Sequence, residues 1–237
     1  MRDKIKISVI IPCFNEEKTI EEVLFNVKKS LNEINWLSEI IVIDDFSTDN
    51  SRAILKNISE KEDIKFIQHD TNKGKGAAIR SGIFLAQGDL VLIQDADLEY
   101  NPNDYQKLLL PFVEANADVV YGSRFIGGGS YVRIHFFWHY LANKILTFAC
   151  NLFTNLNLTD METGYKVIRR EILSTIKLKE DSFGIEPELT IKLAKKKARF
   201  FEVAISYNGR TYDEGKKIGL IDAFRAIYCI LYYSIKS

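Results

Sequence analysis

The chain has 237 residues, with 32 Lys or Arg and 32 Asp or Glu, so its formal net charge is zero. A nucleic-acid-binding protein needs a basic excess, so the composition argues against that class. No run of 18 residues lacks polar groups and the first expected strand begins near residue 5, so we expect neither a transmembrane helix nor a signal peptide. The three cysteines are far apart, which suits reduced thiols in a cytoplasmic protein.

Strand patterns alternate with helix patterns through the first 100 residues. Apolar residues repeat at helical spacing from Ile20, from Ala53 and from Ala77, and Asn15 is the expected N-cap of the first helix. This order predicts βαβ units and therefore an α/β fold with a Rossmann-like, doubly wound, mostly parallel sheet. The expected strands are 5–11, 39–43, 64–67 and 90–93.

The fourth expected strand, Leu90–Ile93, is followed by two acidic residues at alternate positions. Successive strand residues face opposite sides, so Asp95 and Asp97 are expected to point the same way. Two such carboxylates suit a hard divalent cation, Mg²⁺ or Mn²⁺, and Glu99 continues the same parity as a third ligand or as the holder of a metal-bound water. The alternative is a solvated acidic turn.

Three further polar clusters follow the other strands of the first half. In a doubly wound sheet, ligands bind beyond the carboxyl ends of the strands, where all these clusters fall. Asp44 and Asp45 either cap the next helix, as Asp49 also can, or hydrogen-bond a nucleotide. Lys73–Gly76 is either an ordinary basic turn or a segment in which glycine lets the backbone approach a ligand beside Lys75.

The second half adds a strand at Asp118–Tyr121, a helix at Gly184–Lys197 and a strand at Arg199–Tyr207. Two aromatic-rich segments, Ile134–Phe153 and Leu220–Ile235, are too polar to span a bilayer. Each is expected to be an amphipathic helix that either packs on the sheet or lies in a membrane surface.

Four segments carry a resemblance to a known family: IPCFNEEKTIEEVL, EIIVIDDFSTDNS, NKGKGAAIRSGIFLAQGDLVLIQDADLEYNP and ADVVYGSRF. They are similar to family-2 glycosyltransferases of GT-A fold, and most resemble the polyprenyl-phosphate glycosyltransferases, the group that includes the dolichol-phosphate mannose synthases. The resemblance implies one GT-A domain over residues 1–237. Residues 1–125 would form its nucleotide-sugar part, and residues 126–237 its acceptor part with interfacial helices.

The resemblance also implies roles for individual residues. Phe14 stands where the family often has Tyr, and Glu99 where relatives often have Gln. The implied catalytic residues are Asp97, Arg124, Arg210 and Lys216, and the implied metal ligands are Asp95, Asp97 and Glu99. The acceptor phosphate would be held by Ser123, Arg124 and His139. The implied nucleotide-sugar contacts are Pro12, Phe14, Asn15, Glu16, Ile43, Asp44, Asp45, Lys75, Asp95 and Ala96.

The expected activity is an inverting, metal-assisted transfer of mannose or glucose from a nucleotide-diphosphate sugar to polyprenyl phosphate. An anionic phosphate needs no strong general base. The alternative acceptor is a sugar hydroxyl of a cell-surface polysaccharide, for which Glu186 or Glu188 would be the base. A nucleotide-binding scaffold without activity is the third reading. We expect a peripheral protein at the cytoplasmic face of the membrane. Both a monomer and a homo-oligomer are compatible with the sequence.

Overall fold

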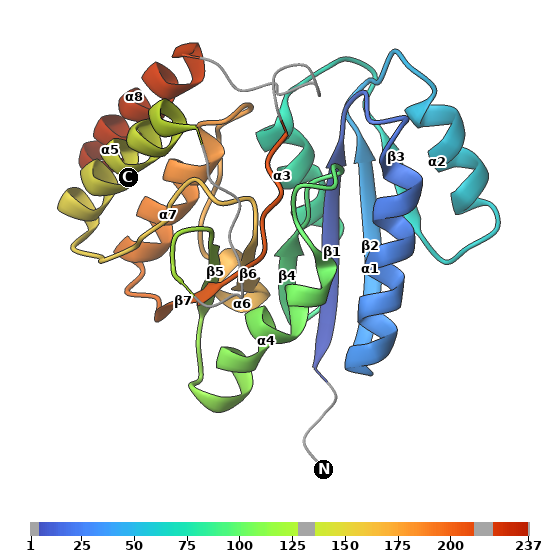
Figure 1. Cartoon of the computed structure of the whole chain (residues 1–237), viewed down its shortest axis with the longest axis horizontal. Coiled ribbons are helices and arrows are strands. Elements are labelled where there is room, and N and C mark those ends of the chain that lie inside the picture. The colour runs from blue at the N-terminus through green and yellow to red at the C-terminus, as the bar shows by residue number, and fades with distance from the viewer. Residues whose placement is uncertain (1–4, 128–135, 211–219, 237) are drawn as a thin grey trace.

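The computed structural model describes residues 5–127, 136–210 and 220–236. Within them, seven strands form one sheet in the order β3-β2-β1-β4-β6-β5-β7 (Figure 1). Strands β1 to β4 pair in parallel, whereas β6 runs antiparallel to both β4 and β5, and β7 is parallel to β5. The strands are β1 Lys6–Cys13, β2 Leu37–Asp44, β3 Lys65–Gln68, β4 Leu90–Ile93, β5 Val119–Ser123, β6 Lys166–Arg169 and β7 Phe200–Ala204.

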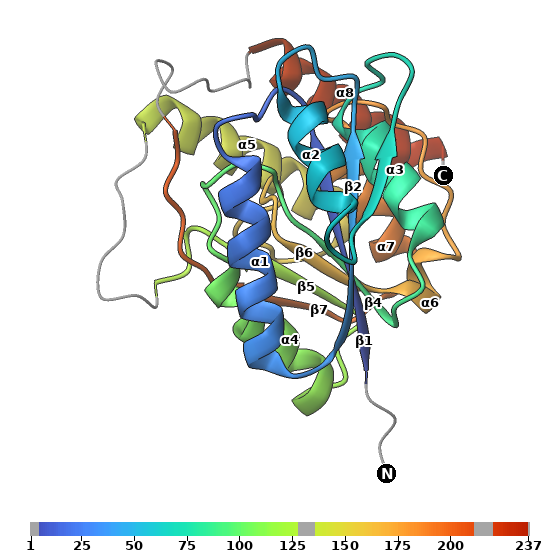
Figure 2. The same cartoon turned by 90° about the vertical axis from the view of Figure 1, so that its right-hand side faces the viewer.

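Helices cover both faces of the sheet (Figure 2). Side chains of α1, α2 and α4 pack on one face, and those of α3, α5, α7 and α8 contribute to the core on the other. The helices are α1 Ile20–Ile34, α2 Ser51–Ser59, α3 Lys75–Leu85, α4 Tyr105–Glu114, α5 Phe137–Thr154, α6 Arg170–Leu173, α7 Ile185–Lys195 and α8 Leu220–Lys236, with a short 3₁₀ turn η1 at Pro102–Asp104.

Strand β4 has the bounds that the sequence predicts, because all four of its residues are apolar and buried. Leu90 and Leu92 join the core on one face, and Val91 and Ile93 join the core on the other. The alternation along β4 therefore buries both faces of the sheet at its centre.

The antiparallel strand β6 was not predicted. Its four residues include Lys166, whose side chain is 2% exposed, so the segment lacks the apolar run of a central strand. It nevertheless lies between β4 and β5, which makes the second half of the sheet mixed rather than doubly wound. Helix α4, which carries Pro111, was also not predicted.

The prediction that Asn15 caps the first helix is wrong. Helix α1 begins at Ile20 with Thr19 as its N-cap, and Asn15 has a left-handed backbone with φ 53°. The Asn15 side chain accepts a hydrogen bond from the amide of Thr48 at 2.7 Å. Asn15 therefore ties the β1 loop to the β2 loop.

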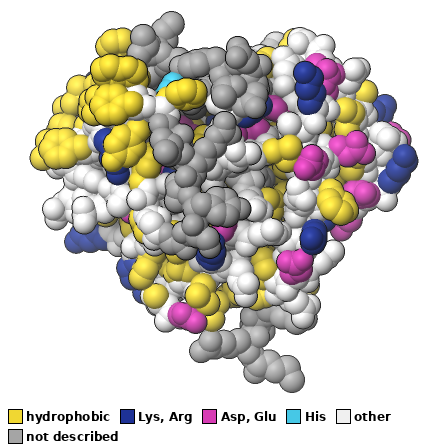
Figure 3. Space-filling model, in the orientation of Figure 1, with side chains coloured by type: hydrophobic (Ala, Val, Ile, Leu, Met, Phe, Trp, Pro, Cys, Tyr) yellow, Lys and Arg dark blue, Asp and Glu magenta, His cyan; other side chains and the backbone are white. Residues whose placement is uncertain are grey.

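Helices α5 and α8 lie side by side and also pack on α7 (Figure 1). Each buries one stripe, such as Leu146 and Cys150 in α5, and exposes aromatic residues elsewhere. Trp138 is 74% exposed and Phe148 is 69% exposed. Hydrophobic side chains gather over these helices in the space-filling view (Figure 3). Among the described residues, no helix combines the length and apolar character needed to cross a bilayer.

Candidate active site

A cavity of about 780 Å³ opens beyond the carboxyl ends of β1 and β4. It is the position where doubly wound sheets bind ligands. The cavity brings together most of the predicted site residues, which come from loops far apart in the chain. Those that line it are Pro12, Phe14, Glu16, Asp45, Lys75, Asp95, Ala96, Asp97, Glu99, Arg124, His139 and Arg210.

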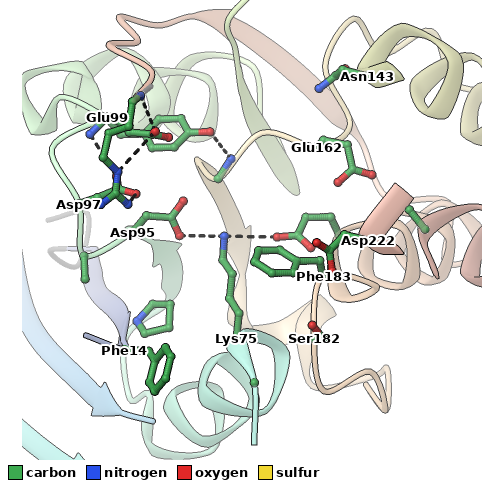
Figure 4. A pocket seen from close by; sticks show the side chains of 18 of the residues that line it. Phe14, Lys75, Asp95, Asp97, Glu99, Asn143, Glu162, Ser182, Phe183 and Asp222 are labelled. Carbon is green, nitrogen blue, oxygen red and sulfur yellow. Dashed lines mark hydrogen bonds and ion pairs between the residues drawn. The ribbon is translucent and has the colours of Figure 1, made fainter. Parts of the chain in front are cut away.

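The acidic turn after β4 is fixed by a buried amide. Gln94 is fully buried, and its Oε1 accepts hydrogen bonds from the hydroxyls of Tyr105 at 2.7 Å and Tyr165 at 2.8 Å. Strand β4 ends at Ile93, before either aspartate. Asp95 and Asp97 therefore enter one cavity because of the turn that follows β4, and not because of the expected alternation along a strand. Figure 4 shows both carboxylates at the same side of the cavity as Glu99.

Arg210 neutralises the acidic side of the cavity. Its Nη2 lies 2.6 Å from Asp97 Oδ2, and its two Nη atoms lie 3.1 and 3.2 Å from the Glu16 carboxylate. Glu99 accepts the Arg210 amide at 2.7 Å and the Tyr207 hydroxyl at 2.8 Å. Burial, together with Asp95 and Glu99, still raises the pKa of Asp97 to about 7. The carboxylates of this turn are thus crowded, and a further cation would stabilise their charged forms.

Lys75 occupies the centre of the cavity at the start of α3. Its Nζ lies 2.8 Å from Asp95 and 3.4 Å from Glu186, so it links the β4 turn to helix α7 (Figure 4). Gly74 has φ +93°, and a Cβ there would lie 2.4 Å from the Asp181 carbonyl oxygen. Glycine is therefore needed for the approach of α3 to the backbone of residues 180–182.

Asp45 holds the turn that precedes α3. Its Oδ1 accepts the amide of Lys73 at 2.9 Å, its Oδ2 accepts the amide of Gly74 at 2.6 Å, and Oδ1 also lies 2.7 Å from His69 Nδ1. The other ring nitrogen of His69 contacts Ser81 at 2.9 Å. These bonds position Lys75.

Arg124 lies at the cavity wall in a buried ion pair. Its Nε and Nη2 donate to the two oxygens of Asp160 at 2.7 and 2.8 Å, and Asn143 donates to the same carboxylate at 3.0 Å. Burial alone would raise the pKa of Asp160, but Arg124 outweighs it and the pKa lies below its ordinary value. The Tyr207 ring lies 5.0 Å from the guanidinium carbon. The Arg124 guanidinium is thus fixed in orientation at the cavity wall.

Several predicted residues lie elsewhere. Ile43 and Asp44 are fully buried, and the Asp44 carboxylate binds Arg52 Nε at 3.1 Å, so their side chains support β2 rather than line the cavity. Ser123 is buried and its hydroxyl contacts Thr159 at 2.6 Å, and Asn15 makes the loop contact described above. Lys216 lies outside the described residues.

The two candidate bases have different environments. Glu188 is fully buried and accepts the amides of Lys179 and Glu180, which makes it a structural anchor. The prediction that Glu188 is a base is therefore wrong, because no part of its carboxylate reaches the cavity. Glu186 is 6% exposed and lines the cavity.

Sequence reasoning missed several residues around the cavity, including Tyr100, Glu162 and Phe183. Asp160 and Glu162 lie in the Asp160–Lys166 segment, which resembles the D-x-x-T-G-aromatic-basic segment of the family. That resemblance predicts a place at the acceptor side of the pocket but assigns no role to either residue. Gly164 in that segment donates to the Tyr100 hydroxyl at 2.7 Å, and a Cβ there would lie 2.4 Å from Asp95. The glycine was the available signal of this close approach.

The sequence profile described as glycosyl transferase family 2 matches residues 8–177. The chain belongs to this family. It is 30% identical to a dolichol-phosphate mannosyltransferase of Pyrococcus furiosus over 95% of this chain and 64% of the relative. It is 30% identical to an uncharacterized protein of Methanocaldococcus jannaschii over 88% of this chain and 93% of the relative.

A third relative of this family 2 glycosyltransferase is the undecaprenyl-phosphate 4-deoxy-4-formamido-L-arabinose transferase of Proteus mirabilis, at 29% identity over 89% of this chain and 62% of the relative. The chain thus spans less than two thirds of the length of the two relatives with a named activity. Glucosyl-3-phosphoglycerate synthase from Mycobacterium tuberculosis, solved with uridine diphosphate, superposes with a TM-score of 0.72 over 97% of this chain and 80% of its own, at 22% identity. This likeness confirms the predicted GT-A fold.

The donor atoms of the acidic turn fit a hard divalent cation. All of them are carboxylate oxygens, and Mg²⁺ is commonly held by one or two carboxylates together with substrate phosphates. Within the described ranges, no three His, Cys, Asp or Glu side chains converge to hold an ion without such a substrate. The arrangement fits Asp95 and Asp97 as ligands that complete their site with a diphosphate.

Proposed function

We propose that the chain transfers a hexose, mannose or glucose, from a nucleotide-diphosphate sugar to a polyprenyl phosphate with inversion at the anomeric carbon. The observation that carries this proposal is one cavity in which Lys75 contacts Asp95 and Arg210 contacts Asp97, and which Arg124 also lines. Such a cavity offers one set of groups to a diphosphate and another to an acceptor phosphate. The relatives named for transfer to dolichyl or undecaprenyl phosphate support the same acceptor class.

The donor would bind at the side of the cavity formed by the loops after β1 and β2. Phe14 is 36% exposed beside Pro12, which gives a nucleobase an apolar surface to pack on. Asp45 lines the same side, and its bonds to the turn before α3 keep Lys75 in place for the phosphates.

Asp95 and Asp97 would hold Mg²⁺ or Mn²⁺, and Glu99 would be a third ligand or hold a metal-bound water. When bound, the cation neutralises charge on the departing diphosphate. Arg210, displaced from Asp97, and Lys216 would add positive charge at the same place. Fixed charges of this kind stabilise the transition state because they require no rearrangement as the charge develops.

The acceptor phosphate would lie at the Arg124 side of the cavity, with Ser123 supporting Arg124 and with His139 near the opening. Asp160 takes Nε and Nη2 of Arg124, so Nη1 is the donor that we assign to the phosphate. The guanidinium is charged at all physiological pH values and binds phosphate oxygens with defined geometry. The phosphate nucleophile is already anionic, so the reaction requires no general base.

A sugar hydroxyl as acceptor is the second candidate, and Glu186 at the cavity wall is the observation that favours it. A transfer assay with radiolabelled GDP-mannose and UDP-glucose separates the two. Transfer to undecaprenyl or dolichyl phosphate into an organic phase supports the first function. Label that reaches only oligosaccharide acceptors would replace it with the second.

We also propose that the exposed residues of α5 and α8 seat the protein on the cytoplasmic leaflet. The cations expected to assist are partly engaged elsewhere, since Arg225 binds Glu180 at 2.7 Å and Lys144 binds the Thr159 carbonyl at 3.1 Å. Lys236 is exposed as well and lies near the end of α8. Burial of aromatic side chains, rather than headgroup charge, therefore supplies most of the expected affinity.

Trp138→Glu and Phe148→Glu are each expected to weaken binding to anionic vesicles by roughly 10-fold or more, because a charge replaces an aromatic anchor. Flotation of the protein with liposomes measures this. Phe25→Glu on α1 is the matched control, since Phe25 is 68% exposed but on the other face of the sheet. A wild type that stays at the bottom of the gradient with every lipid would contradict the membrane proposal and leave self-association through the same surface to be tested by sedimentation.

A further inference from the structure

Two carboxylates at the cavity wall have no role in the transfer proposed above. Glu186 lies in the first turn of α7, and Glu162 lies between α5 and β6. Both line the same cavity as Lys75 and Asp95. In Figure 4, Glu162 lies across the cavity from Asp97 and Glu99, with Lys75 between them.

Each carboxylate has one buried oxygen that lacks a hydrogen-bond partner among the described residues. These atoms are Glu162 Oε1 and Glu186 Oε2. The whole Glu186 residue is 6% exposed. An unsatisfied buried acceptor destabilises a protein, and buried polar atoms in native structures nearly always have partners. A bound ligand that donates hydrogen bonds at this place would satisfy both oxygens.

The position of the pair relative to the metal ligands limits what that ligand is. Glu186 is joined to Asp95 through one side chain, Lys75, whose Nζ contacts both. Glu162 is two residues before Gly164, and Gly164 packs closely on Asp95, since a Cβ on it would lie 2.4 Å from Asp95 Oδ2. The group bound directly to a diphosphate at Asp95 and Asp97 is the sugar, so the sugar ring reaches this pair.

The charges around the pair favour hydroxyl groups over anions. Burial, with Glu186 close by, raises the pKa of Glu162 to about 8, so at neutral pH Glu162 largely holds a proton and is able both to donate and to accept. Lys166 is the nearby buried cation, and its ammonium donates to the Thr163 carbonyl oxygen. Burial lowers the pKa of Lys166 to about 8, although Glu186 and Glu162 oppose the shift. The other cations beside the pair already have carboxylate partners, Lys75 with Asp95 and Glu186 and Arg124 with Asp160, so a second anion would compete with those carboxylates.

We infer that Glu162 and Glu186 bind two hydroxyl groups of the transferred sugar and select a neutral sugar over a uronate. The inference rests on the proposed nucleotide-sugar donor and adds the part of the cavity that recognises the sugar. A carboxylate on the ring would bring a like charge to the unpaired oxygen of Glu186 and would offer no hydrogen to either glutamate. A hydroxyl supplies the hydrogen that each oxygen lacks.

Calorimetric binding to the full chain with Mn²⁺ tests the inference. The probes are UDP, UDP-glucose and UDP-glucuronate, together with GDP and GDP-mannose. Glu186→Gln and Glu162→Gln are each expected to weaken binding of the nucleotide-sugar by about 10-fold more than binding of the bare nucleotide, because a hydrogen bond to a sugar hydroxyl is lost. If the protein binds uridine nucleotides, the preference of the wild type for UDP-glucose over UDP-glucuronate should fall in both variants. If it binds guanosine nucleotides, the loss of affinity in the variants should be measured with GDP-mannose.

Glu171→Gln is the matched control, because Glu171 is an exposed glutamate on α6. An unchanged ratio of nucleotide-sugar to nucleotide affinity in both variants overturns the inference while the proposed donor class stands. Binding of UDP-glucuronate as tight as UDP-glucose to the wild type overturns it as well. If the wild type binds none of the nucleotides, the proposed function fails and this inference fails with it. Circular dichroism establishes that each variant is folded.

Discussion

Asp97→Asn is expected to lower the rate of sugar transfer by about 1,000-fold, because the amide is a much weaker ligand for a hard cation and the cation is what would stabilise the departing diphosphate; loss of one such electrostatic stabiliser typically costs about 100- to 1,000-fold. In the structure, Asp97 is the carboxylate that Arg210 contacts at 2.6 Å. The substitution keeps the size of the side chain and removes its charge. It therefore weakens the metal site and also releases Arg210 from its resting contact.

The measurement is the rate of radiolabelled transfer as a function of Mn²⁺ or Mg²⁺ concentration. EDTA should abolish transfer by the wild type, and either cation should restore it. Asp63→Asn, an exposed residue between α2 and β3, is the control and should behave as the wild type. Full activity in metal-free buffer would contradict the proposed metal site. An Asp97 variant that is slow but keeps the wild-type dependence on metal concentration would assign the effect to Arg210 instead.

Asp160→Asn is expected to lower the free energy of unfolding by about 3 to 5 kcal/mol, because it leaves the buried Arg124 guanidinium without its counter-charge. Asp160 is fully buried, and the Arg124 side chain is 13% exposed. For a domain of this size the loss corresponds to a fall of about 10 °C in the melting temperature. Thermal or urea unfolding followed by circular dichroism measures it.

Asp118→Asn is the matched control for geometry. Asp118 binds Nε and Nη2 of Arg199 at 2.9 and 2.8 Å, the same two-bond arrangement, but the Arg199 side chain is 50% exposed. Exposed pairs contribute little, so this variant should lose much less stability. Replacing both partners by neutral residues, Arg124→Met with Asp160→Asn, should recover part of the loss. Equal losses for the Asp160 and Asp118 variants would contradict the account.

The sequence by itself determined the local elements and the edge of the sheet that carries the site. Leu90–Ile93 is a strand because all four residues are apolar, and the helix patterns between the first four strands place their polar clusters at one edge. Helix α7 was expected at 184–197 and is found at Ile185–Lys195. Local periodicity is sufficient here because these elements depend on residues adjacent in the chain.

The tertiary structure alone decided which distant residues meet. Strand β6 joins the sheet because the antiparallel pairing with β4 and β5 buries a segment whose own residues give little strand signal. Arg210 donates hydrogen bonds to Glu16, 194 positions earlier, and Arg124 donates to Asp160, 36 positions later. Such partners are fixed by packing and chain closure, which no periodicity in the sequence encodes.

The clearest case is the pair of glutamates at the start of α7. Glu186 and Glu188 are two positions apart in the sequence and carry the same side chain, so the sequence offered both as bases. Two positions on a helix are about 200° apart around its axis. The rotation of α7 against the sheet therefore sends Glu186 to the cavity beside Lys75 and Glu188 to the amides of residues 179 and 180. Only the packing of α7 in the folded chain distinguishes a ligand-facing carboxylate from a structural one.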